Sequence, residues 1–274
     1  MKKYSYLLIL GLVFFLISGC ASTCETMGDE NLSGNLNQRV FNPTDDLWVV
    51  SVGINDYTDS YFPNLLFAIN DAQNLGNVLK AQEGLAFKSV NSRVLTGPDA
   101  TKENILSDLE FLQDAKEDDT VILFFALHRI VQNDGFYFMT SDSTYKPEAD
   151  DTESVASLIN FDDIIAALDF HAKKIIILDT HYPKGSGLSE ELEIAIFSAC
   201  RENEQARESH QLGGGVFTSS IIEAFKYAGV NGDVTLESIN EYVIDRVRSL
   251  TDRRQSPVLH APADMKKMVL GIIN

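Results

Sequence analysis

The feature that most constrains the fold is an alternation of short apolar runs with amphipathic segments, which begins at Leu47. The apolar runs are rich in β-branched residues, as buried parallel strands are, and helical periodicity separates them. We expect strands over residues 47–54, 89–96, 120–127, 174–179 and 193–200, and helices over residues 65–79, 102–112, 161–170, 216–227 and 236–250. This order predicts one α/β domain with a mostly parallel sheet covered on both faces.

Two details refine this prediction. Thr101 is a good N-cap, because its hydroxyl can accept a hydrogen bond from an amide of the first helical turn. The segment that begins at Ser256-Pro257 can add a last strand at the edge of the sheet.

The N-terminus has the pattern of a secretory signal. Lys2 and Lys3 precede an apolar run over residues 7–17, which is too short to span a bilayer as a stable helix. The run ends in a segment that resembles the bacterial lipobox, formed by Leu16, Ile17, Ser18, Gly19 and Cys20. This resemblance implies that residues 1–19 are removed and that Cys20 is acylated. The alternative is an ordinary signal peptide that is cut at a small-residue site.

An acylated Cys20 would hold the chain on a membrane without a transmembrane helix. The residue after Cys20 is Ala21 and not aspartate, which is similar to the signal for outer-membrane retention in Gram-negative bacteria. We therefore expect a lipid-anchored protein of the cell envelope, at the outer membrane if the source is Gram-negative. Residues 20–45 are polar and lack periodicity, so they are expected to form a flexible tether before a domain over residues 46–274.

The chain is strongly acidic. It has 22 basic and 40 acidic residues and a formal net charge of -18. Loss of residues 1–19 removes two lysines and no acids, which leaves 20 minus 40, or -20. Such a charge argues against a nucleic-acid partner and favours a cationic one if the acids converge. The three cysteines, Cys20, Cys24 and Cys200, do not form a disulfide framework.

Seven segments of the chain form an ordered set. They are WVVSVGINDY at 48–57, AINDAQNLGNVL at 68–79, LTGPDATKENI at 95–105, DDTVILFFALHR at 118–129, KKIIILDTH at 173–181, IFSACRENEQARES at 196–209 and GGGVFTSSIIEAF at 213–225. In order and spacing, this set resembles the caspase-like cysteine peptidases of the metacaspase type. The resemblance implies the caspase fold, with a mostly parallel six-stranded central sheet and helices on both faces. The site would lie at the carboxyl ends of the central strands.

The catalytic pair of that family is incomplete in this sequence. The family's histidine stands in a Ser-Gly-His-Gly pattern, and His128 is kept here but is followed by Arg129. Arg129 replaces a glycine whose amide serves the oxyanion hole. The family's Asp-x-Cys-His pattern begins here with Asp179, Thr180 and His181, so an imidazole stands where the family has a nucleophilic thiolate. We expect no peptide hydrolysis by the family mechanism, which cleaves after Arg or Lys. Cys200 could replace the thiol, although strand-end cysteines usually serve packing.

Two acids of the family are retained. Asp71 and Asp179 match the pair that lines the pocket for a lysine or arginine side chain in metacaspases. The alternatives are a solvated helix residue for Asp71 and a turn-forming strand end for Asp179. Arg129 could occupy the pocket itself as a plug. His128, His181 and Asp179 could also ligate a divalent metal, against the simpler interpretation of a degenerate site. We expect no cofactor.

Three classes of function remain, in this order. The first is a pseudo-peptidase that binds a basic peptide or partner protein, and it needs an open acidic pocket. The second is an active caspase-family endopeptidase with an unorthodox site, whose turnover would depend on His181 or Cys200. The third is a structural envelope lipoprotein, which predicts an occluded cleft.

Overall fold

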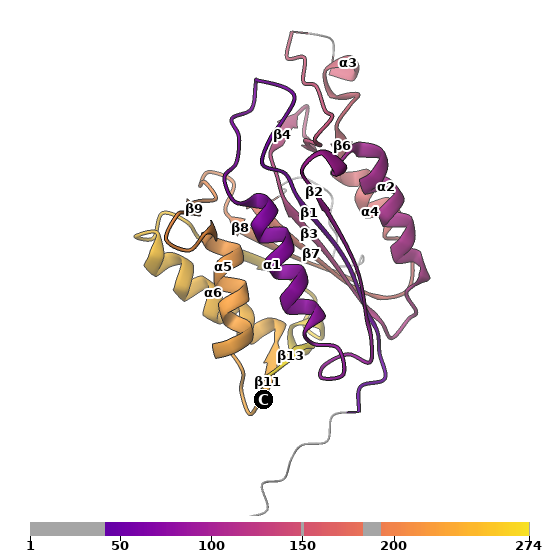
Figure 1. The fold of residues 1–274 in the computed structure, drawn as a ribbon, viewed down its shortest axis with the longest axis vertical. Helices are drawn as coiled ribbons and strands as arrows, with labels where there is room; N and C mark the ends of the chain where they lie inside the picture. Colours follow the sequence, from indigo (N-terminus) through magenta and orange to yellow (C-terminus); the bar gives the residue numbers. More distant parts are fainter. Residues whose placement is uncertain (1–41, 149–150, 183–192, 274) are drawn as a thin grey trace, which may run out of the picture. The chain divides into compact units, whose positions relative to one another are not determined.

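A six-stranded sheet in the order β12-β8-β7-β3-β1-β2 forms the centre of the domain (Figure 1). The computed structural model describes residues 42–148, 151–182 and 193–273. The strands of this sheet are β1 (Leu47–Gly53), β2 (Val90–Thr96), β3 (Thr120–Ala126), β7 (Lys173–His181), β8 (Ile194–Cys200) and β12 (Val258–His260). All neighbouring pairs are parallel except β12 with β8, which is antiparallel. The fold is therefore the mixed α/β fold with a mostly parallel six-stranded sheet that the sequence predicts.

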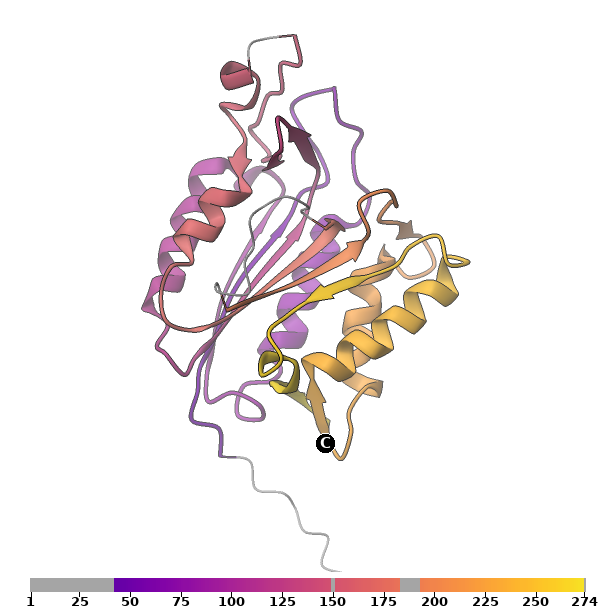
Figure 2. The ribbon, with the colours of Figure 1, turned by 180° about the vertical axis from the view of Figure 1, so that it is seen from behind.

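Helices cover both faces of the sheet (Figures 1 and 2). On one face lie α1 (Ala68–Lys80), α5 (Val216–Tyr227) and α6 (Leu236–Leu250), and on the other lie α2 (Lys102–Phe111) and α4 (Phe161–Ala167). Side chains alternate between the faces along each strand. In β7, Ile175 and Ile177 pack in the core under α1 and α5, while Ile176 and Leu178 pack in the core under α2 and α4. Asp179 has the same parity as Ile177, so it faces α1.

Short elements surround the main sheet. A three-stranded sheet is formed by β4 (Arg129–Gln132), β5 (Gly135–Phe138) and β6 (Ile159–Asn160), and α3 (Asp151–Val155) precedes β6. Two small antiparallel pairs join β9 (Glu208–Ser209) to β10 (Gly214–Gly215), and β11 (Asp233–Thr235) to β13 (Val269–Ile272). Single 3-10 turns occupy Gly97–Asp99, Leu112–Asp114 and Met265–Lys267.

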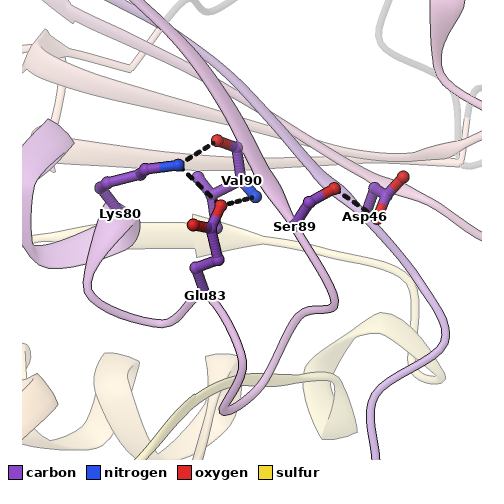
Figure 3. Close-up of polar contacts among 5 residues, drawn as sticks. All are labelled: Asp46, Lys80, Glu83, Ser89 and Val90. Carbon is purple, nitrogen blue, oxygen red and sulfur yellow. Dashed lines mark hydrogen bonds and ion pairs between the residues drawn. The ribbon is translucent and has the colours of Figure 1, made fainter.

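The connection from α1 to β2 is fixed by a polar network (Figure 3). Lys80, the last residue of α1, donates to the carboxylate of Glu83 at 2.6 Å and to the carbonyl of Val90 at 2.9 Å. The amide of Val90 donates to Glu83 at 2.8 Å, and the hydroxyl of Ser89 donates to Asp46 at 2.6 Å. These bonds hold the start of β2 beside the start of β1, which fixes the register of the sheet's edge.

The predicted elements are confirmed with small shifts at their ends. All five strands and all five helices that the periodicity predicts are present, and the terminal segment supplies β12 as an antiparallel edge strand. Thr101 caps α2 by accepting from the amide of Asn104 at 3.2 Å. The signal peptide, Cys20, Ala21 and most of the tether lie outside the described residues. Within the described part of the chain, no helix is long and apolar enough to cross a membrane.

Candidate functional site

A small pocket of about 50 Å³ lies at the carboxyl ends of the central strands. Chain order reverses there, because β2 and β3 flank β1 on opposite sides, and such switch points form the crevices of parallel sheets. The lining residues come from the segment before α1, from α1, from the ends of β3 and β7, and from the loop that leads to α5. They are Leu65, Ala68, Asp71, Ala126, Asp179, Ala206, Arg207, Glu208 and Gly215.

Asp71 is almost fully buried, with 3% of its surface exposed. The amide of Gly215 donates to both of its carboxylate oxygens, at 3.0 and 2.9 Å. This approach requires glycine, because a Cβ at position 215 would lie 3.0 Å from Asp71 Oδ2 and would collide with Asp179 Oδ2. Both carboxylates therefore lie close to Gly215, whose amide binds that of Asp71.

Asp179 ends the regular part of β7 and is half-buried. It accepts a hydrogen bond from the hydroxyl of Thr218 at 2.6 Å, which fixes its orientation toward α5. Burial raises the pKa of Asp71, and the charge of Asp179 raises it further. Burial also raises the pKa of Asp179, against the bonds from Thr218. The two carboxyl groups thus titrate as one coupled pair that resists carrying two negative charges.

Glu208 is a third carboxylate of this pocket, and the motif comparison did not single it out. Its side chain accepts from the amides of Leu66, at 2.9 and 3.0 Å, and of Phe67, at 2.7 Å. These amides immediately precede α1, where the positive end of the helix dipole favours an anion. Glu208 therefore anchors the loop before β10 to the start of α1, and its charge raises the pKa of both aspartates.

Arg129 does not line this pocket. It begins β4 and pairs with Phe138 of β5, and its guanidinium carbon lies 5.5 Å from the centre of the Phe136 ring. Burial lowers the pKa of Arg129, and the nearby Cys200 and Glu202 act in the opposite direction. Among the described residues, no ion pair joins Arg129 to Asp71 or Asp179, so the expected self-plugged network is not formed. The physical reason is the β4–β5 hairpin, within which the Arg129 side chain packs against the ring of Phe136.

His128 follows β3 and is packed among aromatic rings. Its Nε2 lies 2.6 Å from the carbonyl oxygen of Pro63, and a carbonyl only accepts, so Nε2 carries a proton in this tautomer. Ring centres of Tyr57 and Phe62 lie 5.1 and 5.5 Å from that of His128. Burial lowers the pKa of His128, which favours the neutral ring.

His181 and Cys200 are register partners on the neighbouring parallel strands β7 and β8. The Nδ1 atom of His181 is buried without a hydrogen-bond partner, and burial and the charge of Arg129 lower its pKa. Cys200 is fully buried, and burial raises the pKa of its thiol to about 12. A buried, protonated thiol is a poor nucleophile.

The predicted metal alternative has no support from the geometry. Among the described residues, no group of three or more His, Cys, Asp or Glu side chains is placed to hold a metal ion. His128, His181 and Asp179 therefore do not converge as ligands, since His128 is turned to Pro63 and Asp179 to Thr218.

Comparison with known proteins supports the fold. No protein-family profile and no curated protein sequence matches the chain. A crystal structure of a protein from Geobacter sulfurreducens matches with a TM-score of 0.60 at 14% identity, covering 84% of this chain and 100% of that chain. The Drosophila initiator caspase Dronc matches with a TM-score of 0.53 at 14% identity, covering 84% of this chain and 85% of that chain. The chain has a caspase-like fold, and at this identity the likeness shows the fold alone.

Proposed function

We propose that this domain is a caspase-fold binding protein that holds a basic side chain of a peptide or partner protein in the acidic pocket and does not cleave it. One observation carries the proposal: Asp71 and Asp179, with Glu208 beside them, converge on a single pocket. Among the described residues, no lysine or arginine forms an ion pair with either aspartate. Arg207 is in the lining as well, so three carboxyl groups share the pocket with one guanidinium that is not paired with either aspartate.

A cationic side chain suits this pocket in charge and size. Asp71 and Asp179 are buried and close together, which raises their pKa values and makes it unfavourable for both to be ionised. A bound guanidinium or ammonium group would offset this cost, because its positive charge stabilises the ionised carboxylates. The volume of about 50 Å³ exceeds the roughly 10–15 Å³ that a cavity needs to hold one water, so the pocket admits a small polar group such as the end of a lysine or arginine side chain. Binding should weaken at low pH, because protonated aspartates no longer attract the cation.

Hydrolysis is disfavoured by the groups around the pocket. Position 181 holds an imidazole, and the Cys200 thiol is buried with a pKa of about 12. Neither group is an activated nucleophile of the kind that acyl transfer needs. The proposal therefore places the protein among pseudo-peptidases, attached to the cell envelope through Cys20.

Titration of the purified full-length protein with two carboxamide-blocked tripeptides, Gly-Gly-arginine and Gly-Gly-citrulline, tests the proposal. Citrulline has nearly the shape of arginine without the charge. We expect micromolar binding of the arginine peptide and at least about tenfold weaker binding of the citrulline peptide. Asp71→Asn and Asp179→Asn should each weaken the first, while Glu241→Gln, an exposed acid on α6, should not. Equal binding of both peptides, or no effect of either aspartate variant, would favour a structural lipoprotein.

A further inference from the structure

A second, larger cavity adjoins the acidic pocket. It has a volume of about 530 Å³ and shares Arg207 and Glu208 with the acidic pocket. Its wall is completed by the start of α5, by the end of α6 and by the turn between β9 and β10, with Leu66, Leu212 and Leu250 as apolar contacts. If the basic side chain of a ligand enters the acidic pocket, the ligand's backbone atoms next to that side chain would therefore lie in this larger cavity.

Arg207 lines both cavities. Its backbone is fixed, because its amide donates to Gln255 at 3.1 Å and its carbonyl accepts from Val216 at 2.8 Å. Its Nε atom is buried and has no hydrogen-bond partner, and among the described residues its guanidinium forms no ion pair. The other arginine of the cavity, Arg254, already pairs with Asp252 at 3.1 Å. The Arg207 side chain as a whole is only half-buried and lines the cavity, so it is the cation here that a ligand anion could meet without first displacing an ion-pair partner among the described residues.

We propose that the site recognises a C-terminal arginine or lysine, with the side chain in the acidic pocket and the free α-carboxylate on Arg207. This inference rests on the proposed function and names its ligand more narrowly. In a C-terminal basic residue, the cation and the carboxylate branch from one Cα, which matches an acidic pocket that adjoins an arginine with no ion pair in the described part of the chain. A residue inside a polypeptide carries no such carboxylate. The ligand class is therefore the new chain end that cleavage after arginine or lysine produces.

The charge of the whole chain makes this preference diagnostic. A formal charge of -18 repels an added negative charge on a ligand. Without a specific contact, a peptide with a free carboxylate should bind more weakly than the same peptide with a carboxamide. Tighter binding of the free acid would therefore report a local cation.

The experiment compares Gly-Gly-arginine with a free carboxylate and the same peptide with a carboxamide, both acetylated, on the full-length protein. We expect the free acid to bind about tenfold more tightly, as one half-exposed charge-assisted contact allows. In Arg207→Gln the preference should disappear, so that the free acid binds no more tightly than the carboxamide. Arg207→Lys should keep part of the preference. Arg253→Gln, which removes an exposed arginine outside this cavity, should keep the full ratio.

The outcomes separate this inference from the proposed function. Equal or weaker binding of the free acid to the parent protein, with binding that still depends on Asp71 and Asp179, overturns the inference and leaves the proposed function standing. A preference that persists in Arg207→Gln also overturns it. Binding of neither peptide overturns both. The comparison on the parent protein needs no variant, so a folding defect in Arg207→Gln does not protect the inference.

Discussion

Replacing Asp71 by asparagine should stabilise the fold at pH 8 and weaken its binding of basic ligands. The pKa of Asp71 is raised from 3.8 to about 8, mainly by burial and by the charge of Asp179. A rise of about 4 pKa units corresponds to about 5 kcal/mol at most, at about 1.4 kcal/mol per unit. Asparagine keeps one acceptor for the Gly215 amide and loses the other, and it must bury its own donors, which together cost about 3 kcal/mol. The net stabilisation is then about 2 kcal/mol.

The sign of this effect depends on pH. A carboxyl group whose pKa is raised on folding costs no stability below its ordinary pKa near 4, because it is protonated in both states. The cost grows as the pH rises and is complete above the raised pKa of about 8. The free energy of unfolding of the parent should therefore fall between pH 4 and pH 8 relative to that of Asp71→Asn. The two curves should cross at about pH 6, where the ionisation cost of Asp71 equals the roughly 3 kcal/mol that asparagine loses, and below that pH the parent should be the more stable.

Urea unfolding followed by far-UV circular dichroism, repeated from pH 4 to pH 8, measures this difference. A gain of about 2 kcal/mol should also raise the melting temperature at pH 8 by about 5 °C for a domain of this size. Glu241→Gln serves as the charge control, because Glu241 is exposed on α6. If Asp71→Asn shows the same pH slope as the parent, or is less stable at pH 8, the two aspartates do not repel each other in the folded state. A variant that gains stability and loses ligand binding would mark the pair as a functional site, since such sites commonly trade stability for function.

Four further outcomes follow from the same structure. The full-length protein should not cleave Arg- or Lys-terminated reporter peptides, with or without calcium, and His181→Cys alone should not restore cleavage, as a fluorogenic assay can show. Cys200 should resist alkylation by iodoacetamide in the folded protein and react in urea, because its thiol is fully buried with a pKa raised to about 12. Gly215→Ala should lower the affinity for the arginine peptide by about tenfold or more, because its Cβ would force both aspartates out of position. Cys20→Ser should move the protein from the membrane fraction to the soluble fraction in a sedimentation assay, because acyl chains are the expected anchor.

Each of these outcomes has a clear opposite. Cleavage that disappears in His128→Ala would show a working peptidase. Rapid alkylation of native Cys200 would show an exposed thiol. Unchanged affinity in Gly215→Ala would separate the aspartates from ligand binding. Membrane association that survives in Cys20→Ser would refute the lipobox interpretation.

Local sequence was sufficient for the fold class and for most of its elements. Strand and helix periodicity depends on each segment's own residues, and so the positions of β1, β3, α5 and α6, as well as the Thr101 cap, could be predicted. Short elements outside the main sheet, among them β4, β5 and β6, were not predicted. In the structure, Asn133 and Asp134 form the tight turn between β4 and β5, with positive φ values of 49° and 62°. The strands β4, β5 and β6 are short and lie outside the main sheet, so their periodicity is weak.

Only some residues of the candidate site could be predicted from the sequence. Motif order indicated Asp71, Asp179, His128 and His181, because the family's pattern places these residues on recognisable segments. It did not indicate where Arg129 points, because a short hairpin that periodicity does not reveal carries that side chain onto Phe136.

Only the tertiary structure decided which groups share the pocket. Glu208 reaches the amide of Leu66 across 142 positions, and Gly215 reaches Asp71 across 144 positions. Arg207 acquires its place between the two cavities in the same way. These contacts form where loops from separate strands meet at one edge of the sheet. A local pattern specifies each strand and helix, but the meeting of loops depends on the order in which the strands assemble.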